Sequence, residues 1–176
     1  MSIEYRPLHA HECERIKEVN PSRFIKRAWR KVNDVKQWVD INWKDDDYPN
    51  GYEDHLNGLK ATFEGEGFAI GAFNGERLVG FCSVNREVFG NQYKYVLLEQ
   101  LFVSNEYQGR GIGKKLFRLS AEKAKLWGVD KFYICAGSSE DTLAFYSALG
   151  CVDAMEINRR LYEDDENDVQ LEYDLL

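Results

Sequence analysis

The segment Leu97-Leu-Glu-Gln-Leu-Phe-Val-Ser-Asn-Glu-Tyr-Gln-Gly-Arg-Gly-Ile-Gly-Lys114 joins an apolar run to a glycine-rich loop. Leu97–Val103 is typical of a buried strand, and the apolar spacing from Gly111 to Trp127 predicts a helix. Glycines keep side chains out of the loop, and the unpaired amides of a helix N-terminus attract anions. The order strand, glycine loop and helix therefore predicts a pyrophosphate-binding centre.

The glycine spacing excludes two common phosphate-binding loops. A dinucleotide fingerprint needs Gly-x-Gly-x-x-Gly, whereas Gly109, Gly111 and Gly113 alternate and are followed by Lys114. A nucleoside-triphosphate loop needs Gly-Lys-Ser/Thr, whereas Lys115 follows Lys114. Neither of these two phosphate-binding loops fits the sequence.

Two motifs instead resemble the GNAT superfamily of N-acetyltransferases. Gln108, Gly111 and Gly113 match its Arg/Gln-x-x-Gly-x-Gly/Ala signature. Further along, Ala144-Phe-Tyr-Ser-Ala-Leu-Gly-Cys151 resembles its Phe-Tyr-x-x-x-Gly-Phe signature. The resemblance covers about Ile3 to Leu175, and we expect one N-acetyltransferase domain over residues 1–176.

The resemblance implies a mixed α/β (α+β) GNAT fold. Its central sheet is mostly antiparallel, has six to seven strands, is splayed between strands 4 and 5, and is flanked by about four helices. Residues 93–150 would form the acetyl-CoA-binding core, and residues 1–65 would supply most of the acceptor site.

The family motif also implies which residues contact acetyl-CoA. A backbone amide around Leu101 to Val103 would polarise the acetyl carbonyl, and the amides from Gln108 to Lys114 would bind the pyrophosphate. Ser139 stands where the family often has an asparagine that touches the pantetheine. The expected cofactor-binding residues are Leu101, Phe102, Val103, Gln108, Gly109, Arg110, Gly111, Ile112, Gly113, Lys114, Ser139 and Tyr146. For Arg110 and Lys114, ordinary solvated surface is an equal alternative.

Acetyl transfer needs a base and an acid. An amine with a pKa of about 10 is protonated at neutral pH and must lose a proton before it attacks the thioester. Glu99 lies in an apolar strand, where desolvation would raise its pKa, and alternation would put it on the same face as Leu101 and Val103. The resemblance implies that Tyr146 protonates the departing thiolate. A structural hydrogen-bonding role for Glu99 and a core role for Tyr146 are the alternatives.

Composition fits a soluble enzyme with a cationic substrate. The chain has 176 residues, is 44% hydrophobic, and carries a net charge of −7, which argues against nucleic acid as a partner. No apolar segment is long enough to span a membrane, so we expect a cytoplasmic protein. The four cysteines lack metal-ligand or disulfide spacing, and no metal is expected.

Local patterns predict the remaining elements. Strands are expected at Ile3–Arg6, Phe68–Phe73, Arg77–Phe89, Tyr93–Val103, Lys131–Ala136, Cys151–Ile157 and Val169–Leu175. Helices are expected at Ala10–Glu18, Ser22–Asp40, Tyr52–Phe63 and Gly111–Trp127, with a last helix that opens at a Ser138–Asp141 capping box and ends at Leu149. Ile41–Pro49 should be irregular, and Glu163–Asp168 should be a solvated loop.

Three functions remain open from the sequence. The first is acetyl transfer from acetyl-CoA to a primary amine of a small molecule, such as an antibiotic, a polyamine or an amino-acid derivative. The second is acetylation of a protein lysine or N-terminus, and the third is non-catalytic acyl-CoA binding. Asp45-Asp-Asp47 with Trp43 and Tyr48 could form a cationic acceptor site or a solvated loop. Trp29 and Trp38 are candidates for core or homodimer contacts.

Overall fold

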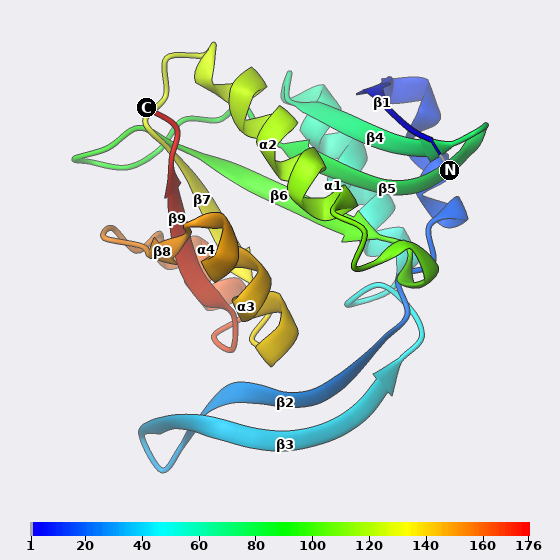
Figure 1. Cartoon of the computed structure of the whole chain (residues 1–176). Helices are drawn as coiled ribbons and strands as arrows, with labels where there is room; N and C mark the ends of the chain where they lie inside the picture. Colours follow the sequence, from blue (N-terminus) through cyan, green and yellow to red (C-terminus); the bar gives the residue numbers. More distant parts are fainter. Residues whose placement is uncertain (1) are drawn as a thin grey trace.

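The computed structural model describes residues 2–176 and contains a seven-stranded sheet with a separate two-stranded hairpin (Figure 1). The strand order of the large sheet is β1-β4-β5-β6-β7-β9-β8. Only β6 and β7 run parallel, so the predicted sheet, mostly antiparallel, is confirmed. The strands are β1 (Ile3–Leu8), β4 (Phe68–Asn74), β5 (Arg77–Val84), β6 (Tyr95–Val103), β7 (Lys131–Ala136), β8 (Val152–Asp153) and β9 (Val169–Asp174).

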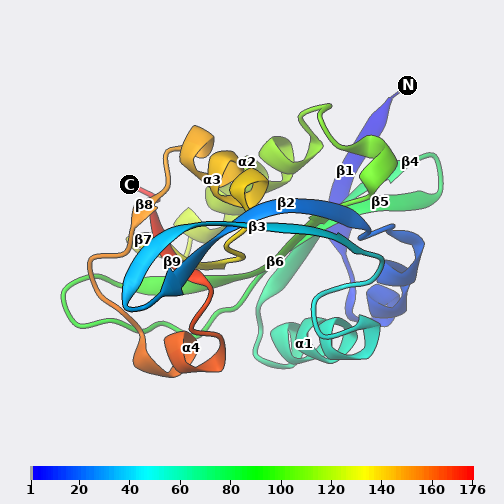
Figure 2. The same cartoon turned by 90° about the horizontal axis from the view of Figure 1, so that it is seen from below.

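Helices cover both faces of this sheet. Figures 1 and 2 show α2 (Ile112–Lys125) and α3 (Glu140–Leu149) on one face, and α1 (Tyr52–Glu64) and α4 (Arg159–Asp164) on the other. Each face has its own apolar core, with Phe117 and Phe132 in the first and Leu59 and Phe81 in the second. Among residues 2–176, no helix is long and apolar enough to cross a membrane.

The predicted helix at Ser22–Asp40 is wrong, because this segment forms a β-hairpin. Strand β2 (Arg23–Val32) pairs with β3 (Val35–Asp45), which also takes up part of the expected irregular stretch. The apolar residues recur every three or four positions, but they are mainly β-branched or aromatic, and such side chains favour strands. Composition therefore outweighs periodicity here.

The hairpin turn explains why the chain reverses at this point. Asn33 and Asp34 have φ angles of 49° and 63°, and a two-residue type I′ turn requires positive φ at both positions. Asn and Asp tolerate this left-handed conformation better than other residues with a side chain. The Asn33-Asp34 pair was the local signal for the hairpin.

Figure 2 shows the molecule from below, and in this view the hairpin crosses in front of β6, β7 and β9. The Trp29 amide donates a hydrogen bond of 2.8 Å to the Ser138 carbonyl, and Arg27 Nε bonds Glu140 at 2.7 Å. These contacts fasten β2 to the start of α3. Trp29 packs edge-on against Trp38 within the hairpin, and the homodimer stays a prediction.

Several element boundaries also differ from the sequence predictions. The segment Ala10–Glu18 is a 3₁₀ helix, η1, and a short 3₁₀ turn, η2 (Asn105–Tyr107), follows β6. Strand β5 ends at Val84, β8 has only two residues, and α4 occupies the beginning of the expected acidic loop. Ser139, and not Ser138, caps α3, because its Oγ accepts the Thr142 amide. The predicted capping box was one residue out of register.

The turn conformation predicts opposite effects for two substitutions at Asp34. Asp34→Gly should slow amide hydrogen exchange in β2 and β3, because glycine adopts positive φ without steric cost. Asp34→Val should speed it, since a β-branched residue in this conformation costs about 1–2 kcal/mol. Equal exchange rates in both variants would contradict the type I′ assignment.

Candidate active site

The two parallel strands β6 and β7 separate soon after they meet. They pair only from Tyr95–Leu97 with Lys131–Tyr133, although β6 continues to Val103. These are the fourth and fifth strands of the sheet, so the predicted splay lies where it was expected. Beyond Leu97, one edge of β6 has no neighbouring strand.

This free edge carries backbone amides that can polarise a carbonyl group. The Ser104 amide donates to the Val79 carbonyl, which makes Val79 and Ser104 a hydrogen-bonded pair of the ladder with β5. Such pairs alternate, so Phe102 also points its amide at β5, while Leu101 and Val103 point theirs toward the divergence. The Phe102 side chain packs against Tyr48.

The glycine loop at the start of α2 fits a pyrophosphate. Gly109 and Gly111 have φ angles of 73° and 78°, and a Cβ at either position would meet nothing within 4 Å. Helix α2 begins directly after Gly111, so its first amides lack intrahelical partners and face this open space. Gly113 lets the helix approach the Phe145 ring, which would lie 3.3 Å from a Cβ. The loop therefore provides both the donors and the room for an anion.

The polar residues of the loop have distinct environments. Gln108 Nε2 donates to the Val103 carbonyl at 3.2 Å and so ties the loop to the free edge of β6. Arg110 donates to the Glu106 carbonyl and stacks over Tyr107, whereas Lys114 is exposed on the first turn of α2. Lys114 is therefore the better placed of the two cations to reach a phosphate.

Glu99 does not share a face with Leu101 and Val103, which corrects the sequence prediction. The register between β5 and β6 shifts so that Ser83 pairs with Gln100 while Val84 pairs with Leu98. Glu99 is the extra residue of a β-bulge, and bulges redirect side chains. Leu101 and Val103 pack toward α2, whereas Glu99 lies beside Gly58 of α1.

The bulge places the Glu99 carboxylate where it is shielded but still reachable. Asn85 Nδ2 donates to its Oε2 at 2.8 Å. Burial by surrounding atoms raises the pKa of Glu99, while the Asn85 hydrogen bond and Arg160 oppose the rise. The side chain as a whole is exposed, so solvent or a ligand can reach it. A carboxylate in this state can attract an ammonium group and accept a proton from it.

Tyr146 lies on the opposite side of the sheet, in the core beneath α3. It is buried, and it packs edge-on against Phe117 and Phe145. Burial raises the pKa of its hydroxyl, with further contributions from Cys82 and from other nearby groups that include Asp168. The phenol is therefore held in its protonated form, as a proton donor must be. The packing is also that of a core tyrosine, the alternative named from the sequence.

Sequence reasoning missed a polar cluster on the face of β7 and β9 that faces α4. Gln170 pairs directly with Cys135 across the two strands, and its Oε1 accepts hydrogen bonds from Tyr133 and Cys135. Asp168 stands just before β9, two residues from Gln170 and therefore in line with that face. We call Cys135, Gln170 and Asp168 the β7–β9 cluster. The alternation of β9 can be recognised in the sequence, but the position of the cluster relative to Glu99 depends on the tertiary fold.

Comparisons with known proteins agree with this architecture. The profile of the Acetyltransferase (GNAT) family matches residues 35–151 of the chain. The chain is a member of the GNAT acetyltransferase family. A search of curated protein sequences found no match.

Solved structures share the GNAT fold at low sequence identity. Nourseothricin acetyltransferase superimposes with a TM-score of 0.73 at 15% identity, over 100% of both chains. A protein assigned as a streptothricin acetyltransferase from Bacillus anthracis, in complex with acetyl coenzyme A, gives 0.66 at 17% identity over 98% of both. The NatC complex bound to Gag peptide and CoA gives 0.62 at 19% identity over 100% of both. At these identities the likeness establishes the fold.

Two sequence-predicted features of this GNAT chain involve residues with structural roles. The Ser139 hydroxyl caps α3 and donates to Thr142 Oγ1 at 2.8 Å, so its contact with a pantetheine stays a prediction. Tyr48 is buried and donates to the Ile16 carbonyl, while Trp43 is largely exposed. The proposed cationic site around residues 45–47 therefore does not assemble.

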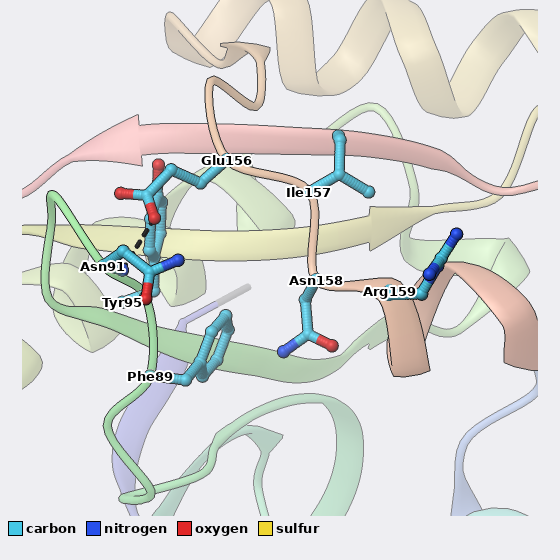
Figure 3. A pocket seen from close by; sticks show the side chains of 8 residues that line it. Phe89, Asn91, Tyr95, Glu156, Ile157, Asn158 and Arg159 are labelled. Carbon is cyan, nitrogen blue, oxygen red and sulfur yellow. Dashed lines mark hydrogen bonds between the residues drawn. The ribbon is translucent and has the colours of Figure 1, made fainter.

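A separate groove of about 440 Å³ lies away from these residues (Figure 3). It is lined by Phe89, Gly90, Asn91, Tyr95, Glu156, Ile157, Asn158 and Arg159. The Glu156 carboxylate accepts the amides of Asn91, Gln92 and Tyr93 at 2.7–2.8 Å. Its oxygens are thus committed to holding the loop before β6, and the groove contains none of the expected site residues.

The glycine loop predicts a specific loss of coenzyme binding in Gly111→Ala. A Cβ at φ 78° strains the turn by about 1–2 kcal/mol and tilts the first amides of α2. Calorimetry should show acetyl-CoA bound about tenfold or more weakly. Gly128→Ala is the matched control, since it has φ 71° and similar open space at the far end of the helix. Equal affinities in both variants would contradict the loop assignment.

Proposed function

We propose that this protein transfers an acetyl group from acetyl-CoA to a primary amine on a small molecule. One observation carries the proposal: an open, glycine-lined helix N-terminus and partly desolvated carboxylates border the same strand divergence. The first fits the pyrophosphate of acetyl-CoA, and the second fits a cationic acceptor. Family membership supplies the reaction class.

Several residues of the chain would have separate roles in this reaction. The amides of Leu101 and Val103 would hold the carbonyl oxygen as negative charge develops on it. Glu99 would draw the ammonium group in and accept its proton, directly or through water. Tyr146 would donate a proton to the sulfur as the carbon–sulfur bond breaks. The reaction would need no metal. We expect it to take place in the cytoplasm.

A small acceptor is favoured by the hairpin. Strands β2 and β3 run across the sheet in front of β6, β7 and β9 (Figure 2), and Trp29 and Ala28 join β2 to Ser138 and Ser139. This connection restricts approach from that side. The nourseothricin and streptothricin acetyltransferases, which share the fold, are named for small amine-bearing antibiotics.

The test is acetyl-CoA-dependent thiol release with polyamines, aminoglycosides, amino acids and basic peptides, alongside calorimetric binding of acetyl-CoA. Turnover with one class of small amine is the expected result. Turnover with peptides alone would replace the proposal with protein acetylation. Binding of acetyl-CoA without any turnover would instead indicate a non-catalytic binder.

Tyr146→Phe should lower kcat by about tenfold to ten-thousandfold, because the thiolate loses its proton donor. Acetyl-CoA binding should be nearly unchanged, since the ring that packs against Phe117 is retained. Tyr173→Phe is the matched control: Tyr173 also packs against Phe117, but it lies on β9. Unchanged kcat in Tyr146→Phe would remove Tyr146 as the acid.

Glu99→Gln should lower kcat/KM for the amine by about tenfold or more at neutral pH, because it removes a charge that attracts the ammonium group and accepts its proton. Acetyl-CoA affinity should not change. Glu87→Gln removes the same charge from an exposed loop and should keep wild-type kinetics. Equal losses in both variants would indicate a general effect of net charge and not a role for Glu99.

A further inference from the structure

Asp168 lies at the open end of the strand divergence. The next residue, Val169, pairs with Ala136 at the end of β7, which places Asp168 level with the connection to α3. Its backbone amide donates to the Asp165 carbonyl at 3.1 Å, which fixes the turn into β9. The side chain is half-buried, and it belongs to the β7–β9 cluster.

The Asp168 carboxylate differs from the other shielded carboxylates. Within residues 2–176 it makes no hydrogen bond and no ion pair within 4.0 Å. By contrast, the buried Glu172 carboxylate accepts Lys131 Nζ and the Tyr95 hydroxyl, each at 2.6 Å. A shielded carboxylate normally has such partners, because its desolvation is costly without them. Asp168 therefore has oxygens available for a ligand.

The groups that face Asp168 come from four elements. Burial raises its pKa to about 6, and Asp165 of the same loop adds to the rise. Arg30 and Arg23 of β2 oppose it and favour the ionised form. The charge of Asp168 in turn acts on Cys135 of β7 and on Tyr146 of α3. Glu99, by comparison, is bonded to Asn85 and lies on the α1 side.

We propose that Asp168 is a second proton acceptor for the reacting amine, positioned at the open end of the strand divergence, while Glu99 holds the amine from the α1 side. The inference rests on the proposed function. It adds a residue that the sequence had placed in a solvated loop, and it gives the loop before β9 a chemical role.

The step balances with these two side chains and Tyr146. The R–NH₃⁺ group gives one proton to the Asp168 carboxylate, and the freed nitrogen lone pair attacks the thioester carbon. A carbon–nitrogen bond forms, and the carbon–sulfur bond then breaks. Tyr146 protonates the sulfur and is reprotonated by the second proton leaving nitrogen. Asp168 releases its proton to solvent, so each turnover yields amide, free thiol and one proton.

The test compares pH profiles of kcat/KM for the panel amine with the highest turnover. Wild-type activity should fall about tenfold per pH unit below about pH 6, because only the ionised carboxylate accepts a proton. Asp168→Asn should lose at least tenfold at pH 7.5 and should lack this acid limb. Glu99→Gln should keep the limb. Glu166→Gln, an exposed acid in the same loop, should match wild type.

A second pair of measurements separates chemistry from folding. Burial penalises the charge of Asp168, so Asp168→Asn should melt no lower than wild type at pH 8, and any gain should vanish near pH 4. Sodium formate should restore activity to Asp168→Ala, because it can replace a missing carboxylate near the reacting atoms.

The outcomes separate the two proposals. An acid limb that persists in Asp168→Asn, or Asp168→Ala that formate does not rescue, overturns the role of Asp168 and leaves the acetyltransferase proposal standing. No wild-type turnover with any amine or peptide of the panel overturns the proposed function, and this inference falls with it. Loss of the limb in Asp168→Asn together with rescue by formate supports both.

Discussion

The separation of β6 from β7 after three residue pairs is the constraint on which the rest of the site depends. A sheet interior rarely leaves backbone groups unpaired, because an unpaired buried amide or carbonyl is costly. Here the strand edge from Leu101 to Val103 is left for other partners. Gln108 takes the Val103 carbonyl, and the amides remain available for the oxygen of a substrate. The loss of sheet pairing thus creates the donors that acetyl transfer needs.

The same separation explains why the glycine loop and the carboxylates can serve one reaction. Helix α2 starts at Ile112, nine residues after β6 ends at Val103, and it packs on the same face of the sheet as α3. Glu99 faces the opposite side because of the bulge, and Asp168 lies at the end of β9. Where β6 and β7 part, groups from both faces border the same opening. In a fully paired sheet they would be screened by the strands.

Much of this could be predicted from the sequence, for identifiable reasons. The segment from Leu97 to Lys114 combines a strand, a glycine loop and a helix whose signals are local, and the structure keeps all three. The prediction of a helix at Ser22–Asp40 was wrong because it relied on the spacing of apolar residues. The side-chain types and the Asn33-Asp34 turn favour a hairpin instead. The predicted face of Glu99 was wrong because a β-bulge depends on how β6 pairs with β5. Period-two alternation along one strand cannot show this pairing. Asp168 was missed because its neighbours come from β2, β7 and α3, and only the tertiary fold brings these together.

The energetics of the carboxylates distinguish structural from chemical roles in this chain. Glu172 and Glu156 are tied to donors that lower the pKa of each, so both stay ionised and contribute to stability at neutral pH. Glu99 and Asp168 have raised pKa values, so the fold bears a cost for their ionised forms, and this cost appears as pH rises. A fold selected only for stability would pair these groups or replace them with amides. Two penalised carboxylates beside the divergence of β6 and β7 are therefore better explained by a cationic partner that is charged when it arrives and neutral when it reacts.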